Sequence, residues 1–420
     1  MNVPNPTKGD IVHNDVTNHL RPATGPAAAR SHGRSRPRTR PRLRTAALTA
    51  LVSLGLVAPG VVLAPASQAN TGTSCTGSTV HGAAVQDGST WRAFRGTTQL
   101  YSGGDMLTAI NTAIGGLDAG RTSKQRVVVN GSGTMSANSR ITLPSYTTLE
   151  SCGTIHVTGS GSGNVAGVYM RGATDIEVAR LALTGTPVYG IFARNVDNLR
   201  LRDIDMRLSG GGIGVRIDNH GDTSRYARNI TINSAYVSGS GSHGVETYGV
   251  DGLTVGTVTA RNVGGSGLLL NQTINATVGT VDAVNAGAGT GYAALRLANR
   301  AGRVGSSYPT NIQVGTVRAS SGGRGIFCVS ESGGLRINRV EISGTGNNPV
   351  LLENCYNVSL ATSGGTISGG DVRLAARSEF PGNRDIVLEN LTLTSGARVV
   401  ENPCTTNLTI RNVSGPVVRC

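Results

Sequence analysis

Residues 244–258 read GVETYGVDGLTVGTV, and this stretch contains the pattern that decides the fold. Side chains alternate between the two faces of a strand, so Val245 and Thr247 share one face while Glu246 and Tyr248 share the other. A glycine-punctuated second strand follows, and the same two-strand phrase recurs from about residue 166 onward. The other first strands begin at residues 190, 214, 267, 294, 325, 349 and 371, at intervals of 22 to 31 residues.

This repeat predicts the fold class. Neither strand of one copy can bury an apolar face alone, so successive copies must stack. Parallel stacking of short strands joined by small turns predicts an all-β parallel β-helix, or solenoid. The first and third residues after each opening residue are predicted to fill its interior: Ile191/Ala193, Val215/Ile217, Val245/Thr247, Leu268/Leu270, Leu295/Leu297, Ile326/Cys328 and Val350/Leu352. The fifth is often an amide and is predicted to form a side-chain ladder at a turn: Asn195, Asn219, Gln272, Asn299, Asn354 and Asn402.

The ends of a solenoid expose unpaired backbone and apolar side chains, so they need caps. Residues 103–117, GGDMLTAINTAIGGL, predict an N-terminal capping helix, because Asp105 is a favourable N-cap and apolar residues recur on one helical face. We therefore divide this part of the chain into a segment 70–140 that contains the cap and β-helix coils over 141–420.

Residues 1–69 differ from the rest and are predicted to be a secretory signal with an extended basic front end. A basic, proline-interrupted run at 30–44 precedes an apolar stretch at 45–64, and small residues follow at Ser67 and Ala69. A membrane anchor is the alternative interpretation. Cleavage after Ala69 predicts a secreted, extracellular protein with no membrane attachment.

The charge of the chain depends on that signal. The formal net charge is +14, but without the nine basic and two acidic residues of the signal it falls to +7. Half of the net basicity therefore belongs to the export signal, and we expect no nucleic-acid partner. The remaining positive charge is almost entirely arginine and favours an acidic partner.

All six cysteines follow the predicted signal, which favours disulfides in an exported chain. No CxxC spacing is present, so a zinc or redox site is not expected. Proximity in the repeat suggests the pairs Cys328–Cys355 and Cys404–Cys420, which leaves Cys75–Cys152.

A helical cap followed by a strand and then by coils such as "GIFARN" and "NITINSAYV" resembles the pectin-lyase-like superfamily of right-handed parallel β-helices. The resemblance covers roughly residues 100–420 and is one of architecture, because no catalytic signature of a single family matches. It implies a single-stranded right-handed parallel β-helix. It also implies a polysaccharide partner, often an acidic one, bound in an external groove. Other members of the superfamily are tailspikes, adhesins or epimerases, so the fold alone does not decide function.

Candidate site residues are those on the outward face of the coils from residue 214 to residue 299 and in the two long loops beside them. Adjacent coils lie about 4.8 Å apart, so outward side chains can converge on one sugar chain. The candidate catalytic residues are Asp218, His243, Glu246 and Tyr248. The candidate substrate-binding residues are Arg216, His220, Arg225, Asn271, Arg296 and Tyr308.

Two chemistries fit these residue types. A lyase acting on a uronic acid must neutralise the carboxylate, a role for Arg216 and Arg296, and must remove the C5 proton. Tyr248 or His243 could remove it if nearby arginine lowered its pKa. A glycoside hydrolase or transferase instead needs two carboxylates, here Asp218 and Glu246.

Arginine enrichment and the resemblance favour the lyase, and the remaining alternative is a non-catalytic glycan-binding protein or adhesin. A salt-bridge ladder on an exposed sheet is the structural alternative for the charged residues. No cofactor is required by either chemistry. Calcium is an optional ligand, to which Asp218, Asp222 and Glu246 could donate.

Overall fold

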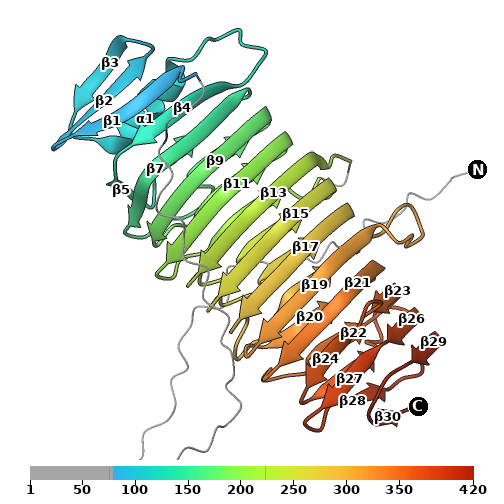
Figure 1. Ribbon diagram of the computed structural model, residues 1–420. Coiled ribbons are helices and arrows are strands. Elements are labelled where there is room, and N and C mark those ends of the chain that lie inside the picture. The colour runs from blue at the N-terminus through green and yellow to red at the C-terminus, as the bar shows by residue number, and fades with distance from the viewer. Residues whose placement is uncertain (1–74, 76–78, 223) are drawn as a thin grey trace, which may run out of the picture. The chain divides into compact units, whose positions relative to one another are not determined.

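The computed structural model describes Cys75, residues 79–222 and residues 224–420, and it is an all-β parallel β-helix, as predicted (Figure 1). The predicted secretory segment 1–69 lies outside these residues. Within the described residues, 30 strands and one helix are present. That helix has ten residues, and no helix in the described part is long and apolar enough to cross a membrane.

The first strands of the repeat form a 12-stranded parallel sheet, here called the narrow sheet. Each strand between the two end strands pairs with the corresponding strand of the coils before and after it. Along the coils it consists of β6 (Ile141–Thr142), β8 (Ala166–Arg171), β10 (Tyr189–Arg194), β12 (Ile213–Asp218), β14 (Val245–Tyr248), β16 (Leu268–Asn271), β18 (Ala293–Ala298), β20 (Arg324–Cys328), β22 (Val350–Glu353), β25 (Asp371–Ala375), β28 (Arg398–Glu401) and β30 (Val417–Val418).

The second strands form an 18-stranded sheet, here called the wide sheet. Its members are β1 (Gly82–Asp87), β2 (Thr90–Arg95), β3 (Thr98–Gly103), β4 (Gln125–Asn130), β5 (Gly133–Ser136), β7 (Thr147–Thr158), β9 (Thr174–Gly185), β11 (Asp197–Leu208), β13 (Ala227–Ser238), β15 (Val250–Arg261), β17 (Ile274–Val284), β19 (Ile312–Ser320), β21 (Ser332–Ser343), β23 (Cys355–Leu360), β24 (Gly365–Ser368), β26 (Arg384–Glu389), β27 (Leu391–Thr394) and β29 (Thr406–Arg411). At its start β1, β2 and β3 form an antiparallel meander, which the repeat pattern did not predict.

The interior of the coils is filled by the predicted side chains. Every predicted interior residue, from Ile191/Ala193 to Val350/Leu352, has an exposed fraction of 0%. The register aligns these residues in columns, so that Ile191 lies opposite Val215, Val215 opposite Val245 and Val245 opposite Leu268. Stacking therefore removes from water the apolar surface that a single coil would leave exposed.

The capping helix is α1 (Met106–Gly115). Asp105 is its N-cap, and its carboxylate accepts a hydrogen bond from the backbone N–H of Thr108 at 2.6 Å. Met106, Ala109, Ile110, Ala113 and Ile114 are buried, and the helix contacts β1, β2, β3, β5 and β6. The helix thus covers the apolar end of the first coils.

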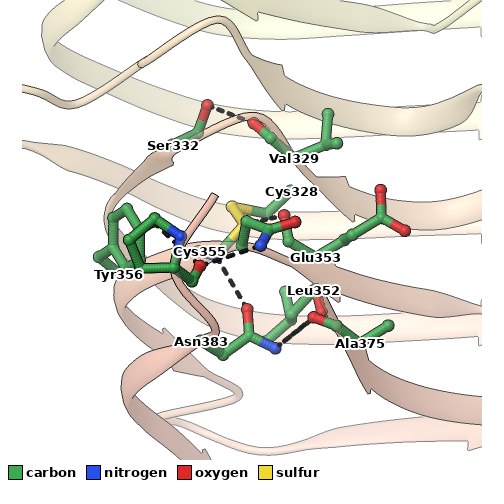
Figure 2. The surroundings of a disulfide bond; sticks show 11 residues. Cys328, Val329, Ser332, Leu352, Glu353, Cys355, Tyr356, Ala375 and Asn383 are labelled. Carbon is green, nitrogen blue, oxygen red and sulfur yellow. Dashed lines mark hydrogen bonds between the residues drawn. A yellow bond between two sulfur atoms is a disulfide. The ribbon is translucent and has the colours of Figure 1, made fainter. Parts of the chain in front are cut away.

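The three predicted disulfides, Cys75–Cys152, Cys328–Cys355 and Cys404–Cys420, are confirmed. Figure 2 shows the second, which joins the end of β20 to the start of β23 in the next coil. Asn383 supports the same corner: its side chain donates to the carbonyls of Leu352 and Ala375 and accepts from the N–H of Cys355.

The amide residues occupy turns, but the predicted ladder is wrong. Asn195, Gln272, Asn299 and Asn354 have φ between 45° and 57°, a left-handed conformation that asparagine tolerates better than most residues. Asn354 donates to the carbonyls of Arg377, Phe380 and Pro381, and Asn219 to those of Asp222 and Arg225. The amides of Asn219 and Asn354 therefore bind the backbone of the turns, and that of Asn299 binds the side chain of Asn271 and not the corresponding amide of a neighbouring coil.

Candidate functional site

The outward face of the narrow sheet aligns the candidate residues in two columns. In one column Arg216 on β12 lies opposite Glu246 on β14. In the other, Asp218 lies opposite Tyr248, and Tyr248 lies opposite Asn271 on β16. The repeat thus brings together side chains that are 23 to 30 residues apart along the chain, as the register predicted from sequence requires.

Asp218 is held between two arginines. The guanidinium of Arg194 donates to its two carboxylate oxygens at 2.7 and 2.8 Å, and Arg216 Nε donates to Oδ2 at 2.9 Å. Asp218 is 1% exposed. Burial alone would raise its pKa, but the hydrogen bonds and charges of Arg194 and Arg216 lower the pKa below its ordinary value. Asp218 therefore stays ionised to lower pH than an ordinary aspartate does.

Glu246 is buried in a different environment. Arg216 Nη1 donates to its Oε2 at 2.8 Å, and Asn271 Nδ2 donates to its Oε1 at 3.0 Å. Asn299 then donates to Asn271 Oδ1 at 3.0 Å, which fixes the orientation of that amide. Burial raises the pKa of Glu246 above its ordinary value, and the charge of Asp218 raises it further against the opposing effect of Arg216. Glu246 can therefore exchange a proton closer to neutral pH than an exposed glutamate does.

Tyr248 and His243 lie next to this network. Tyr248 is half-buried, and burial raises the pKa of its hydroxyl despite the positive charge of Arg216. His243 is 8% exposed, and its Nδ1 accepts a hydrogen bond from the backbone N–H of Ser266 at 2.8 Å. Burial, together with the charges of Arg296 and Arg216, lowers the pKa of His243 to about 3. The ring is therefore neutral, with its proton on Nε2.

Arg296 lies two strands beyond Glu246 and is held by aromatic rings. Its guanidinium carbon is 4.9 Å from the ring centroid of Tyr292 and 5.0 Å from that of Phe327. Tyr292 in turn packs edge-on against His243, with ring centroids 5.0 Å apart. The positive charge of Arg296 is thus stabilised by cation–π contacts with the rings of Tyr292 and Phe327.

Three predicted binding residues are not part of this network. His220 is exposed, and only its backbone N–H contacts the site, donating to Asp218 Oδ1 at 3.3 Å. Arg225 donates to the carbonyl of Asn195 at 3.2 Å. Tyr308 packs against Tyr356 of β23, with ring centroids 4.9 Å apart.

The proposed calcium ligands are not assembled into a cation site. Asp218 and Glu246 bind arginine, and the carboxylate of Asp222 accepts hydrogen bonds from Ser224 in its own turn. Among the described residues, the one cluster with metal-ligand spacing is Cys75, Glu150 and Cys152, whose two cysteines are joined in a disulfide.

Two hollows of about 360 Å³ each lie away from the network. One is lined by wide-sheet residues such as Asp282, Arg318 and Glu341, and the other by residues such as Tyr308, Tyr356 and Arg384. The groove expected over residues 214–299 stays a prediction.

Sequence reasoning missed several members of the network. Arg194 occupies the outward column next to Asp218, and this alignment was a usable signal for the pair. Asn299 was predicted to belong to the amide ladder, and Phe327 faces outward but was not among the candidate site residues. Tyr292 and Arg324 precede the outward positions of their strands. These contacts depend on the conformations of long side chains that reach from one coil to the next. The repeat pattern alone does not predict those conformations.

No family model matches the sequence, and no curated protein matches it. Solved structures that match include the A-module of the mannuronan C-5 epimerase AlgE4 from Azotobacter vinelandii, at 12% identity and a TM-score of 0.40, covering 74% of this chain and 93% of that chain. The A-module of the mannuronan C-5 epimerase AlgE6 from the same organism matches at 12% identity and a TM-score of 0.27, covering 75% and 95%. Similarity at this level carries no argument about activity.

Proposed function

We propose that this chain is a secreted enzyme that cleaves a uronic-acid-containing polysaccharide by β-elimination, as a polysaccharide lyase does. The observation that carries the proposal is the contrast between two carboxylates on neighbouring strands. Two arginines hold Asp218 in its ionised form, whereas burial raises the pKa of Glu246. Environments that separate the pKa values of paired acids are typical of acid–base sites.

Glu246 is the general base in this proposal. Its carboxylate takes the proton from C5 of a uronate residue, and the released electron pair forms the C4–C5 double bond as the bond from C4 to the glycosidic oxygen breaks. A raised pKa supports this role, because the ionised form of a weaker acid is a stronger base. Arg216 and Asn271 hold the carboxylate in position through one hydrogen bond to each oxygen.

Tyr248 is the general acid, which donates its hydroxyl proton to the departing oxygen. Burial keeps this hydroxyl protonated, because it raises the pKa. The sequence suggested Tyr248 or His243 as the base. That role requires that arginine lower the pKa of the residue and that the residue have an atom free to accept a proton. The pKa of Tyr248 is raised instead, and the imidazole nitrogen of His243 that is free of Ser266 already carries a proton.

Glycoside hydrolysis is a weaker candidate for this site. It needs two carboxylates, one of which donates a proton while the other acts as base or nucleophile. Asp218 accepts three arginine hydrogen bonds and is almost fully buried, so it suits neither role. A non-catalytic glycan-binding protein is the second candidate, because both oxygens of Glu246 already accept hydrogen bonds.

The test is incubation of the full chain with a panel of acidic and neutral polysaccharides, with and without added calcium, while ultraviolet absorbance reports the unsaturated product. We expect Glu246→Gln to lower the rate by about 10²- to 10⁴-fold, the usual contribution of a general base, and Tyr248→Phe by a similar factor. The matched controls lie on the wide sheet. Glu341→Gln removes a carboxylate that also binds arginines, and Tyr236→Phe removes the hydroxyl of a ring that packs against the guanidinium of Arg207.

Each other outcome rejects the lyase in a defined way. New reducing ends without the absorbance indicate a hydrolase, and binding without any product indicates a glycan-binding protein. Incorporation of solvent deuterium at C5 without cleavage indicates proton transfer followed by reprotonation, which is epimerisation.

A further inference from the structure

Arg296 and Arg324 flank one aromatic ring on the outward side of the narrow sheet. The guanidinium carbon of Arg296 is 5.0 Å from the centroid of Phe327, and that of Arg324 is 4.9 Å from the same centroid. Phe327 lies directly opposite Arg296 in the sheet register. Two cations therefore share a single ring two to three strands beyond Glu246.

Neither arginine forms an ion pair with a carboxylate of the described residues. Among the ion pairs of the described residues, none includes Arg296 or Arg324, although most other arginines of the coils form one. The acid that raises the pKa of Arg324, Glu353, forms an ion pair with Arg377 at 2.7 Å, and the acid that raises the pKa of Arg296, Glu246, forms one with Arg216 at 2.8 Å. Arg324 donates one hydrogen bond to the carbonyl of Gly291, but the Nε atoms of both arginines are buried without a hydrogen-bond partner.

This arrangement is unfavourable in the free protein. A buried donor without a partner is destabilising, and two neighbouring like charges repel. Burial lowers the pKa of Arg324, and the positive charge of Arg296 lowers it further. Both guanidinium groups remain charged because the ordinary arginine pKa is above 12. Ring faces compensate part of this cost, and the side chain of Tyr292 hydrogen-bonds Arg296, but neither supplies a negative charge.

We infer that Arg296, Arg324 and Phe327 form a subsite that binds the carboxylate of a uronic acid residue. The side chain of Arg296 is partly exposed and can donate to an incoming carboxylate, whose two oxygens match the planar guanidinium. Arg324, at 9% exposed, contributes positive charge from within the sheet surface. Leu269 lies between Glu246 and Arg296 in the same column, so the subsite is next to the proposed base.

This inference rests on the proposed function for the choice of a sugar carboxylate as ligand. Its test is calorimetric binding of defined oligouronates, of their carboxyl-reduced counterparts and of a sulfated neutral oligosaccharide. The full chain carries Glu246→Gln in every arm, which prevents turnover. We expect binding of at least one oligouronate, with the carboxyl-reduced and the sulfated oligosaccharides bound at least tenfold more weakly. Added salt should weaken the oligouronate binding.

Arg296→Gln should weaken that binding by roughly tenfold to a hundredfold, the usual effect of losing charge-assisted hydrogen bonds. Arg296→Lys, which retains the charge without the planar fork, should have an intermediate effect, and Arg324→Gln should have a smaller one with a weaker salt dependence. Arg336→Gln on the outer face of β21 is the matched control, because Arg336 is exposed and its Nε donates to Asn338 Oδ1. Thermal unfolding of each variant confirms that it is folded.

Equal binding by Arg296→Gln and the parent chain would overturn the inference, as would equal binding of carboxylated and carboxyl-reduced oligomers, tighter binding of the sulfated one, or no binding of any oligouronate. The two proposals fail separately. Arginine-dependent binding without product formation by the chain with Glu246 intact rejects the lyase and retains the subsite. Product formation that is unaffected by Arg296→Gln rejects the subsite and retains the lyase.

Discussion

Asp218 and Glu246 show how one arginine can serve two carboxylates in different ways. Arg216 hydrogen-bonds both, yet Asp218 also receives both bonds of Arg194, while Glu246 receives only an additional neutral amide. The pKa of Asp218 therefore falls while that of Glu246 rises. The difference arises from the number of cationic donors around each group, because both are buried.

His243 makes the stability of the fold depend on pH. Burial, Arg296 and Arg216 lower its folded-state pKa to about 3, whereas an unfolded histidine titrates near pH 6.5. The unfolded chain therefore binds the extra proton below pH 6.5, and stability is lost as the pH falls from there toward 3. At about 1.4 kcal/mol per pH unit, lowering the pH from 7 to 5 should remove about 2 kcal/mol of unfolding free energy through this residue.

Urea unfolding at a series of pH values measures this loss. His243→Asn should abolish the histidine contribution, so its stability should fall by about 2 kcal/mol less than that of the wild type over the same range. His156→Asn on the outer face of β7 is the control and should follow the wild type, because that ring is exposed. Parallel curves for wild type and His243→Asn would contradict the prediction.

The strands of the repeat could be predicted from sequence because apolar residues recur at their interior positions in successive coils. Val245 and Thr247 alternate with outward residues as a two-residue period requires, and copies of that period occur in every coil. The meander of β1 to β3 was missed because it does not belong to the repeat. Its signals were present nonetheless: Gly88 follows Asp87 at the first turn and has φ 61°, and Gly96 at the second has φ 54°.

The candidate site was predictable to the extent that it follows from register. The proximity of Arg216, Asp218 and Glu246 required only that β12 and β14 be adjacent and aligned. The position of Tyr308 could not be predicted from register, because this residue lies in a long loop outside the repeat. Its ring packs against Tyr356. Nor did the pKa directions follow, because they depend on which arginine reaches which oxygen.

Glycines at the corners permit the coils to approach each other closely. A Cβ atom at Gly241 would lie 2.2 Å from the carbonyl oxygen of Gly211 in the preceding coil, which is far inside van der Waals contact. Gly241→Ala should therefore force the two coils apart and lower the unfolding free energy by about 1–3 kcal/mol, the usual cost of overpacking. Urea unfolding measures the loss.

Gly120→Ala is the matched control for this corner. Its Cβ would meet no atom within 4 Å, and its φ is not in the left-handed region, so stability should not decrease. If Gly241→Ala were as stable as Gly120→Ala, the prediction would be wrong, because the corner would then accommodate a methyl group without forcing the two coils apart.

The molecule as a whole is held together by contacts between successive coils. Strands of both sheets pair with their counterparts in neighbouring coils, so each coil depends chiefly on the coil before it and the coil after it. Arginine–carboxylate pairs follow the same rule on the outer surface, as in Arg194–Asp218 and Arg216–Glu246. A binding face built on the narrow sheet is therefore as rigid as the stack beneath it, which suits preorganised charges.

Such a stack should respond locally to loss of its cap. Ile110 of α1 is fully buried at the start of the coils, and Ile110→Ala removes apolar contacts worth about 2–5 kcal/mol. Because stability in a solenoid passes between neighbours, the amides of β4, β5 and β7 should exchange hydrogen faster, while those of β20 and β22 should exchange at the wild-type rate. Hydrogen exchange followed by mass spectrometry resolves the two regions.

Thr108→Ala, at an exposed position of the same helix, should leave both regions unchanged. Uniformly faster exchange in Ile110→Ala would instead mean that the coils unfold as a single cooperative unit, so that the cap stabilises the site on the narrow sheet as strongly as it stabilises the first coils.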